Sequence, residues 1–353
     1  MTLDRAAIAA AVAGLVAAAA WSSALGPSGT ERSAARANGA VAGAATAYEW
    51  QYAATNADQV PDEVLRAASR ITIAVVDTGA DLAAPDLAAK APRTYNARSG
   101  RGAVVDANGH GTFVASLAGG AVDDGAGISG FGGDARLLVV KAGSASGSFT
   151  DADEARAIRY AVDHGANIVN LSISGTTTST AERRAVSYAV RHGVLLVAAA
   201  GNDHAAGDPV EYPAALLQPV GSNGAGGAGL VVAASRPDGA RASFSNTGSW
   251  ISLAAPGQGV LGAVSAASSP QQYPRTDVPG STALYGYASG TSFAAPQVAG
   301  AAALVWAANR ALTAAQVASI LKETASGSGV WNAELGYGVI DVAAAVARAR
   351  ELA

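Results

Sequence analysis

Runs of mostly apolar residues, rich in Val, Ile, Leu and Ala, recur along the chain and constrain its fold more than any other feature. Six of them occupy residues 71–76, 137–141, 167–173, 194–199, 230–234 and 251–254. They do not alternate strictly between apolar and polar residues, which is typical of strands buried on both faces of a parallel sheet. We therefore expect these runs to form the core strands of a sheet that helices cover on both sides.

Ala-rich stretches with helical spacing lie between these runs, at residues 153–164 and 181–192. Each ends in His-Gly, so Gly165 and Gly193 are expected to cap the two helices. Strands that alternate with helices predict an α/β domain with a doubly wound, mostly parallel sheet flanked by helices. In such sheets ligands bind beyond the carboxyl ends of the strands, so functional residues are sought directly after the apolar runs.

Composition narrows the possible functions. The chain has 353 residues, of which 50% are hydrophobic and 14% charged, enough for one substantial folded domain. It has no cysteine, which excludes disulfides, thiolate metal sites and a Cys nucleophile. The net charge of −4 gives no electrostatic reason to expect nucleic acid or an anionic membrane as a partner.

The N-terminus is expected to carry an export signal. An apolar run at residues 8–20 follows Arg5, and its length suits a signal peptide better than a membrane span. An uncleaved anchor and an Ala-rich cytosolic helix are the alternatives. We expect residues 1–25 to be the signal or anchor, residues 26–47 a flexible linker, and residues 48–353 the folded domain. The mature protein is then secreted, free of the membrane unless residues 8–20 remain uncleaved.

Four residues carry the candidate chemistry. Asp77 ends the first run, and Asn202 follows the run at 194–199. His110 stands between two glycines at the start of a helical stretch, and Ser292 precedes a long Ala-rich helix. Taken singly, each has a structural explanation, such as a turn Asp, a surface His or a helix-capping Ser. Their order Asp, His, Ser is the order found in subtilisin-type hydrolases.

Around these residues the chain resembles the subtilisin-like serine peptidases. The matching segments are Val75-Val76-Asp77-Thr78-Gly79, Asn108-Gly109-His110-Gly111-Thr112, Ala200-Gly201-Asn202 and Gly290-Thr291-Ser292-Phe293-Ala294-Ala295-Pro296. The resemblance implies a three-layer subtilisin-like peptidase domain over residues 48–353. It also implies Ser292 as nucleophile, His110 as general base, Asp77 as the group that orients the imidazole, and Asn202 as an oxyanion donor.

The resemblance also locates the substrate, which is a polypeptide. Residues 170–175 match the segment that pairs with the substrate chain and forms one wall of the S1 pocket, and Ala199–Gly201 matches another wall. The implied substrate-binding residues are Ser172, Ile173, Ser174, Gly175, Ala200, Gly201 and Glu211. Glu211 matches a position at the base of S1, where a buried carboxylate favours Lys or Arg at P1. The alternative, slightly favoured on sequence alone, is that Glu211 faces solvent.

Calcium is the one cofactor that the resemblance implies, and it is structural, since catalysis needs none. Residues 122–128 look like the family's calcium loop, which makes Asp86 and Asp124 the candidate side-chain ligands. A solvated acidic turn is the alternative. Two departures from the family stand out. No full propeptide fits before Trp50, and residues 262–287 are longer than in compact members and are expected to form a surface loop.

Three functions remain open at this point. The first is an active secreted endopeptidase, expected to be a monomer. The second is a catalytically silent protein that uses the same fold to bind peptides. The third is a processing protease held at the membrane by residues 8–20.

Overall fold

The computed structural model describes residues 48–122, 127–278 and 281–353 of the chain. The predicted signal or anchor at residues 1–25, the linker at 26–47 and the candidate ligand Asp124 lie outside these ranges. Among the described residues, no helix is both long enough and apolar enough to cross a membrane.

Seven parallel strands form the central sheet, in the order β2-β3-β1-β4-β5-β6-β7. Six of them correspond to the apolar runs, with ends shifted by up to two residues. These are β1 (Thr72–Asp77), β3 (Arg136–Lys141), β4 (Ile168–Leu171), β5 (Leu195–Ala199), β6 (Gly229–Ser235) and β7 (Leu253–Pro256). The edge strand β2 (Arg93–Asn96) was not predicted, because its RTYN sequence is polar and half-exposed. The predicted doubly wound α/β class is confirmed.

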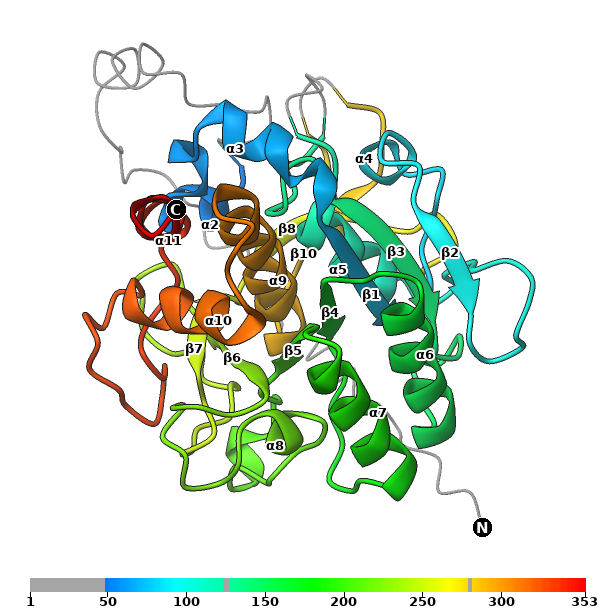
Figure 1. Ribbon diagram of the computed structural model, residues 1–353. Coiled ribbons are helices and arrows are strands. Elements are labelled where there is room, and N and C mark those ends of the chain that lie inside the picture. Colours follow the sequence, from blue (N-terminus) through cyan, green and yellow to red (C-terminus); the bar gives the residue numbers. More distant parts are fainter. Residues whose placement is uncertain (1–47, 123–126, 279–280) are drawn as a thin grey trace.

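Helices cover both faces of this sheet (Figure 1). On one face lie α6 (Asp151–Asp163), α7 (Thr180–Arg191) and the short α8 (Ala214–Leu217). On the other face α5 (His110–Gly119) and α9 (Thr291–Ala308) pack directly on the strands. Outside α9 lie α3 (Asp62–Ala67), α10 (Ala314–Glu323) and α11 (Val342–Glu351).

The sheet separates two hydrophobic cores, and β1 contributes to both. Ile73 and Val75 point into the core on the α5 and α9 side, and Ala74 and Val76 point into the core on the α6 and α7 side. All four side chains are fully buried. Because successive side chains of a strand point to opposite faces, an unbroken apolar run is what burial on both faces requires.

Both ends of α6 and α7 are capped, and the C-terminal caps are the two glycines that the sequence predicted. Thr150 and Ser179 cap the N-termini of α6 and α7 through their side chains. Gly165 and Gly193 follow the two C-termini with φ of 79° and 71°, a left-handed conformation that glycine adopts without strain. At each of these two turns the chain returns to the edge of the sheet where the parallel strands begin.

The expectation of a surface loop at residues 262–287 was wrong in part. This region contributes to a three-stranded antiparallel sheet in the order β8-β10-β9, formed by β8 (Val260–Ala263), β9 (Arg275–Thr276) and β10 (Tyr285–Ala288). Its side chains Tyr273 and Tyr285 are buried. The prolines and polar residues that suggested a loop lie between the strands, while the buried aromatic residues hold the segment against the domain.

Candidate active site

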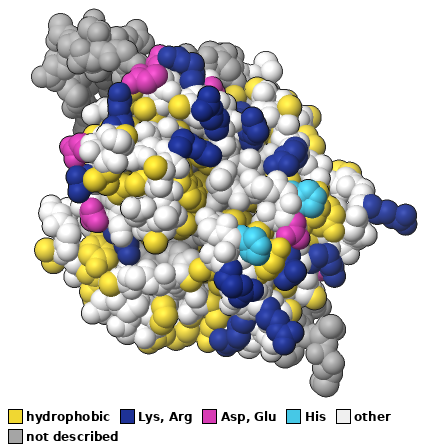
Figure 2. All heavy atoms as spheres, viewed as in Figure 1, with side chains coloured by type: hydrophobic (Ala, Val, Ile, Leu, Met, Phe, Trp, Pro, Cys, Tyr) yellow, Lys and Arg dark blue, Asp and Glu magenta, His cyan; other side chains and the backbone are white. Residues whose placement is uncertain are grey.

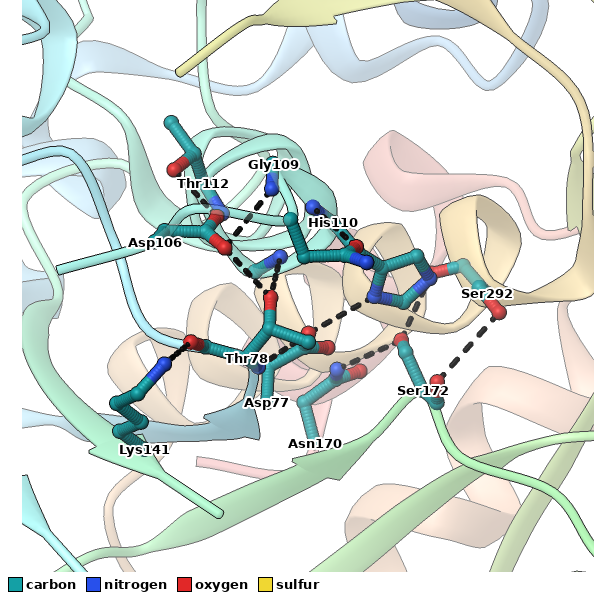
Figure 3. A network of polar contacts seen from close by, with 12 residues as sticks. Asp77, Thr78, Asp106, Gly109, His110, Thr112, Lys141, Asn170, Ser172 and Ser292 are labelled. Atoms are coloured by element: carbon teal, nitrogen blue, oxygen red, sulfur yellow. Dashed lines mark hydrogen bonds and ion pairs between the residues drawn. The ribbon is translucent and has the colours of Figure 1, made fainter. Parts of the chain in front are cut away.

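Asp77 is the last residue of β1, and its carboxylate is fully buried. One oxygen, Oδ1, accepts hydrogen bonds from the Thr78 N–H at 2.7 Å and from His110 Nδ1 at 2.8 Å (Figure 3). An ionised carboxylate only accepts, so Nδ1 carries the proton, and in the neutral ring Nε2 is the acceptor. The contact therefore fixes the tautomer of His110, a residue that comes from a different element.

His110 is the first residue of α5, and it is 5% exposed. Burial lowers its pKa, but the attraction and hydrogen bond of Asp77 and the charge of Asp106 raise it, and the net pKa lies above the ordinary value. The sheet edge thus holds an imidazole that takes up a proton more readily than a free histidine does.

Asp106 is a buried residue that the sequence analysis missed. Its Oδ1 accepts from the Thr78 hydroxyl and the Gly109 N–H, both at 2.8 Å. Its Oδ2 accepts from the N–H of Thr112 at 2.8 Å and from the hydroxyl of Thr112 at 2.7 Å. These bonds tie the residue that follows Asp77 to the first turn of α5, so Asp106 sets the position of His110 relative to Asp77 (Figure 3). The signal available in the sequence was an Asp four residues before His110, in the same turn-rich segment.

Ser292 is the second residue of α9, where helical N–H groups have no intrahelical acceptor. Pro296 lacks the N–H that would bond the Ser292 carbonyl in a regular helix. That carbonyl instead accepts from the Ser172 hydroxyl at 2.7 Å. The Ser292 hydroxyl is oriented toward the Ser172 carbonyl at 3.5 Å, and the imidazole of His110 lies between Ser292 and Asp77 (Figure 3).

Asn202 lies beside the start of α9, beyond the carboxyl end of β5. Its Oδ1 accepts from the Thr291 N–H at 2.9 Å and the Thr291 hydroxyl at 3.1 Å. The backbone donor fixes the orientation of the amide and leaves Nδ2 as a donor with no acceptor among the described residues. The Ser292 N–H likewise has no acceptor there. Two donors without an acceptor among the described residues therefore lie at the start of α9, one on Ser292 itself and one on the side chain that is bonded to Thr291.

The predicted S1 segments lie together, beyond the carboxyl ends of β4 and β5. Gly175 pairs with Tyr212 through two backbone hydrogen bonds, of 3.1 and 2.8 Å. Gly201 donates to the Thr291 hydroxyl at 3.2 Å, which connects the second segment to α9. The two strands are followed directly by the remaining predicted residues, Ser172, Ile173 and Ser174 after β4 and Ala200 after β5.

Glu211 does not face solvent, since its side chain is 1% exposed. Its Oε1 accepts from Asn246 Nδ2 at 2.9 Å and lies only 2.3 Å from where a Cβ on Gly201 would be. Its Oε2 makes no hydrogen bond. Burial raises the pKa of Glu211 to about 7, Asp203 adds to the rise, and the Ser174 hydroxyl opposes it. The carboxyl group thus lies directly beneath the Gly201 backbone, close to Ser174.

The segment 264–276 covers the start of α5 from outside. Ser265 donates to the Asp106 carbonyl at 2.7 Å, and the Ala266 N–H donates to Asp81 Oδ2 at 2.9 Å. A Cβ on Gly109 would come within 2.6 Å of Ser268 and 2.9 Å of Tyr273. This close packing explains why glycine precedes His110.

Two buried carboxylates accept hydrogen bonds from consecutive backbone N–H groups at the end of the proposed calcium loop. Asp86 Oδ1 accepts from the Ile128 N–H at 2.9 Å and Oδ2 from the Tyr285 hydroxyl at 2.8 Å. Glu49 Oε1 accepts from the Ser129 N–H at 3.0 Å, and its Oε2 is buried without a partner. Burial raises the pKa of Glu49 to about 8, and the charge of Asp86 adds to the rise. Glu49 was missed because a lone Glu outside any motif gives no signal.

The negative charges of Asp86 and Glu49 repel each other, and a cation bound to both would stabilise them. Gln51 Oε1, two residues along the chain from Glu49, is also buried without a hydrogen bond. Oxygen atoms of this kind are the donors that Ca²⁺ prefers. The described part of the chain contains no cluster of three or more His, Asp or Glu side chains that could hold a metal. A cation here would need backbone carbonyl or amide oxygens as well.

Comparison with known proteins identifies relatives. Residues 68–338 match the subtilase family (peptidase S8). Halolysin of Haloferax mediterranei is 41% identical over 312 residues, covering 85% of this chain and 53% of halolysin. A thermophilic serine proteinase of a Bacillus species is 33% identical, covering 76% of this chain and 60% of the relative. The chain thus spans only between half and two thirds of the length of these relatives.

Solved structures show the same fold. Fervidolysin from Fervidobacterium pennivorans, described as a keratinolytic enzyme related to subtilisin, superimposes with a TM-score of 0.71 at 28% identity. The match covers 85% of this chain and 45% of fervidolysin. A protease from Pseudoalteromonas arctica superimposes with a TM-score of 0.64 at 28% identity, covering 82% of this chain and 93% of that one. The predicted subtilisin-like three-layer fold is confirmed.

Replacing Asp106 by Asn tests the role of Asp106. Each carboxylate oxygen faces one backbone N–H, so the new NH₂ group meets a donor in either orientation. We expect Asp106→Asn to lower the free energy of unfolding by about 1–3 kcal/mol, measured by urea denaturation. Asp81→Asn is the matched control, because Asp81 also accepts from two backbone N–H groups but is half-exposed. Equal losses in both variants would contradict the role given to Asp106.

Proposed function

The chain belongs to the subtilase family, and we propose that it is a serine endopeptidase that cleaves polypeptides through Asp77, His110 and Ser292. The observation that carries this proposal is the buried contact between Asp77 and His110 beside Ser292, at the start of α9. Several of the curated relatives are named as proteases or as a serine proteinase, which supports the same activity.

The proposed reaction uses the geometry directly. The Ser292 hydroxyl turns from the Ser172 carbonyl toward His110 Nε2, gives up its proton there, and attacks the substrate carbonyl carbon. The resulting oxyanion is held by the Ser292 N–H and Asn202 Nδ2, the two unpaired donors. His110 then returns the proton to the leaving amine, and Asp77 stabilises the imidazolium in between. Water hydrolyses the acyl-enzyme through the same steps in reverse.

The first test is labelling of the folded protein with a fluorophosphonate probe, which reacts with an activated serine. We expect labelling that Ser292→Ala abolishes. Asn202→Ala should retain the fold but lower kcat on a peptide substrate by about 10²–10³, because one oxyanion donor is lost. A folded wild-type protein that fails to label would favour the silent peptide-binding function over the enzyme.

We propose further that the Glu211 carboxylate recognises the P1 side chain of the substrate. Support comes from its burial beneath Gly201, its unbonded Oε2, and the pairing of Gly175 with Tyr212 next to it. A buried carboxylate with one unpaired oxygen is stabilised by a substrate cation, which favours Lys or Arg at P1. The Ser174 side chain, where the family usually has Gly, narrows the same pocket.

Peptide substrates that differ only at P1 test this proposal. At pH 8–9 Glu211 is largely ionised, since its pKa is about 7. We expect kcat/KM at least tenfold higher for Arg than for Leu under these conditions, a difference of about 1.4 kcal/mol. The preference should fall as the pH drops below 7 and should disappear in Glu211→Gln. Equal cleavage of both substrates by the wild type would show that Glu211 does not read P1.

A structural Ca²⁺ ion is proposed at Asp86, with Glu49 as a second carboxylate ligand and Gln51 Oε1 as a neighbouring oxygen. The role proposed for Asp124 stays a prediction from the sequence. When bound, the ion would neutralise two buried carboxylates and hold the N-terminal segment to the loop after α5. None of the catalytic steps above passes through the metal.

Thermal unfolding of Ser292→Ala with and without a calcium chelator tests the site without self-digestion. We expect the chelator to lower Tm, because an ion at 100 times its Kd stabilises the fold by about 2.7 kcal/mol. In Glu49→Gln the chelator should have a much smaller effect. A Tm of the Ser292→Ala protein that does not respond to the chelator would rule out a stabilising ion.

Export is proposed from the sequence of the N-terminus. The apolar run at 8–20 after Arg5 supports a signal peptide, with release of a monomeric enzyme to the exterior. N-terminal sequencing of the labelled protein distinguishes a cleaved signal from an anchor that keeps the enzyme in the membrane fraction.

A further inference from the structure

The starting edge of the seven-stranded sheet, which lies opposite the proposed catalytic residues, carries a row of basic side chains. Arg93 opens β2, Arg136 opens β3, and Arg70 ends the short helix η2 (Ala68–Arg70) just before β1. His164 and His192 follow α6 and α7, directly before the turns into β4 and β5. Because the strands are parallel and ordered β2-β3-β1-β4-β5, these residues follow one another along a single edge.

Part of this row surrounds a cavity of about 420 Å³. Lys90, Arg93, Arg136 and His164 line it, together with Thr72 and Leu137, and no carboxylate does. Arg93, Arg136 and His164 are exposed, so the cavity opens to solvent. We refer to it as the basal cavity. Its lining presents at least three positive charges to any group that enters it.

These charges are not neutralised by the protein. Lys90 Nζ donates to the Gly133 carbonyl at 2.8 Å, and Arg93 Nη2 donates to the His164 carbonyl at 3.0 Å. Neither these two residues nor Arg136 forms an ion pair with any part of the chain that the structure describes. Burial lowers the pKa of Lys90 to about 8, and the attraction of Asp134 opposes this only in part. An anion in the cavity would supply the missing negative charge.

The charge imbalance extends beyond the basal cavity. Figure 2 shows that Lys and Arg side chains outnumber Asp and Glu across this side of the molecule. The chain as a whole has a net charge of −4, so the excess is local. The ring Nδ1 atoms of His164 and His192 contact the backbone carbonyls of Tyr160 and Tyr188 in the last turns of α6 and α7, which accounts for their positions. These contacts do not account for Arg93 and Arg136, which open strands.

We propose that this edge binds a linear anionic polymer, one charged group of which enters the basal cavity. Neighbouring strands are about 4.8 Å apart, so the row from β2 to β5 extends over roughly 20 Å and can contact several charges of one chain. The six residues of β1 also span about 20 Å, and this length of strand lies between the row and Asp77. The bound enzyme would keep its catalytic edge facing away from the polymer.

Binding is measured by isothermal titration calorimetry with the Ser292→Ala protein, using long-chain polyphosphate and inorganic phosphate as separate probes. We expect polyphosphate to bind much more tightly than phosphate, with an affinity that falls steeply as salt is added, because bound counterions are released. Arg136→Glu and Arg93→Glu should each lower the affinity for polyphosphate at least tenfold.

Arg101→Glu is the matched control, since Arg101 is exposed and lies beyond the carboxyl end of β2. It changes the net charge equally and should alter the affinity by no more than about twofold. The Tm of each variant establishes that it is folded. The proposal is overturned if polyphosphate does not bind, if it binds no better than phosphate, or if Arg101→Glu weakens binding as much as Arg136→Glu does.

Discussion

The hydrogen bond between the buried carboxylate of Asp77 and His110 Nδ1 is the interaction on which the proposed function depends. A carboxylate at the end of a core strand is costly to bury unless it is paired. The parallel sheet provides the place, because the carboxyl end of β1 opens toward the N-termini of α5 and α9. The backbone then brings His110 and Ser292 to Asp77 from segments 33 and 215 residues further along the chain.

The contact between Asp77 and His110 is supported by residues outside the proposed triad. Asp106 ties the turn after Asp77 to the first turn of α5. Segment 264–276 packs against Gly109 through the side chains of Ser268 and Tyr273. On the other side, Pro296 frees the Ser292 carbonyl for Ser172, which connects α9 to the proposed substrate-binding segment after β4. One hydrogen bond therefore links the proposed nucleophile to the proposed wall of the S1 pocket.

Much of this arrangement is predictable from sequence, for identifiable reasons. Strands buried on both faces leave unbroken apolar runs, so six of the seven core strands were predicted. Asp77, His110, Ser292 and Asn202 lie in local motifs, and these could be compared directly with a family. Asp106 and Glu49 could not be found in this way, because their importance comes from burial and from partners distant in sequence. Glu211 shows the same limit, since sequence alone slightly favoured an exposed side chain and the structure buries it.

A ¹⁵N NMR titration of His110 in the Ser292→Ala protein tests the central claim most directly. If Asp77 holds the imidazole as described, Nδ1 stays protonated throughout, and Nε2 is the nitrogen that titrates. The pKa should lie above the ordinary value for histidine, about 6.5, because the charges of Asp77 and Asp106 outweigh burial. A neutral ring protonated at Nε2, or a pKa at or below 6.5, would contradict the account.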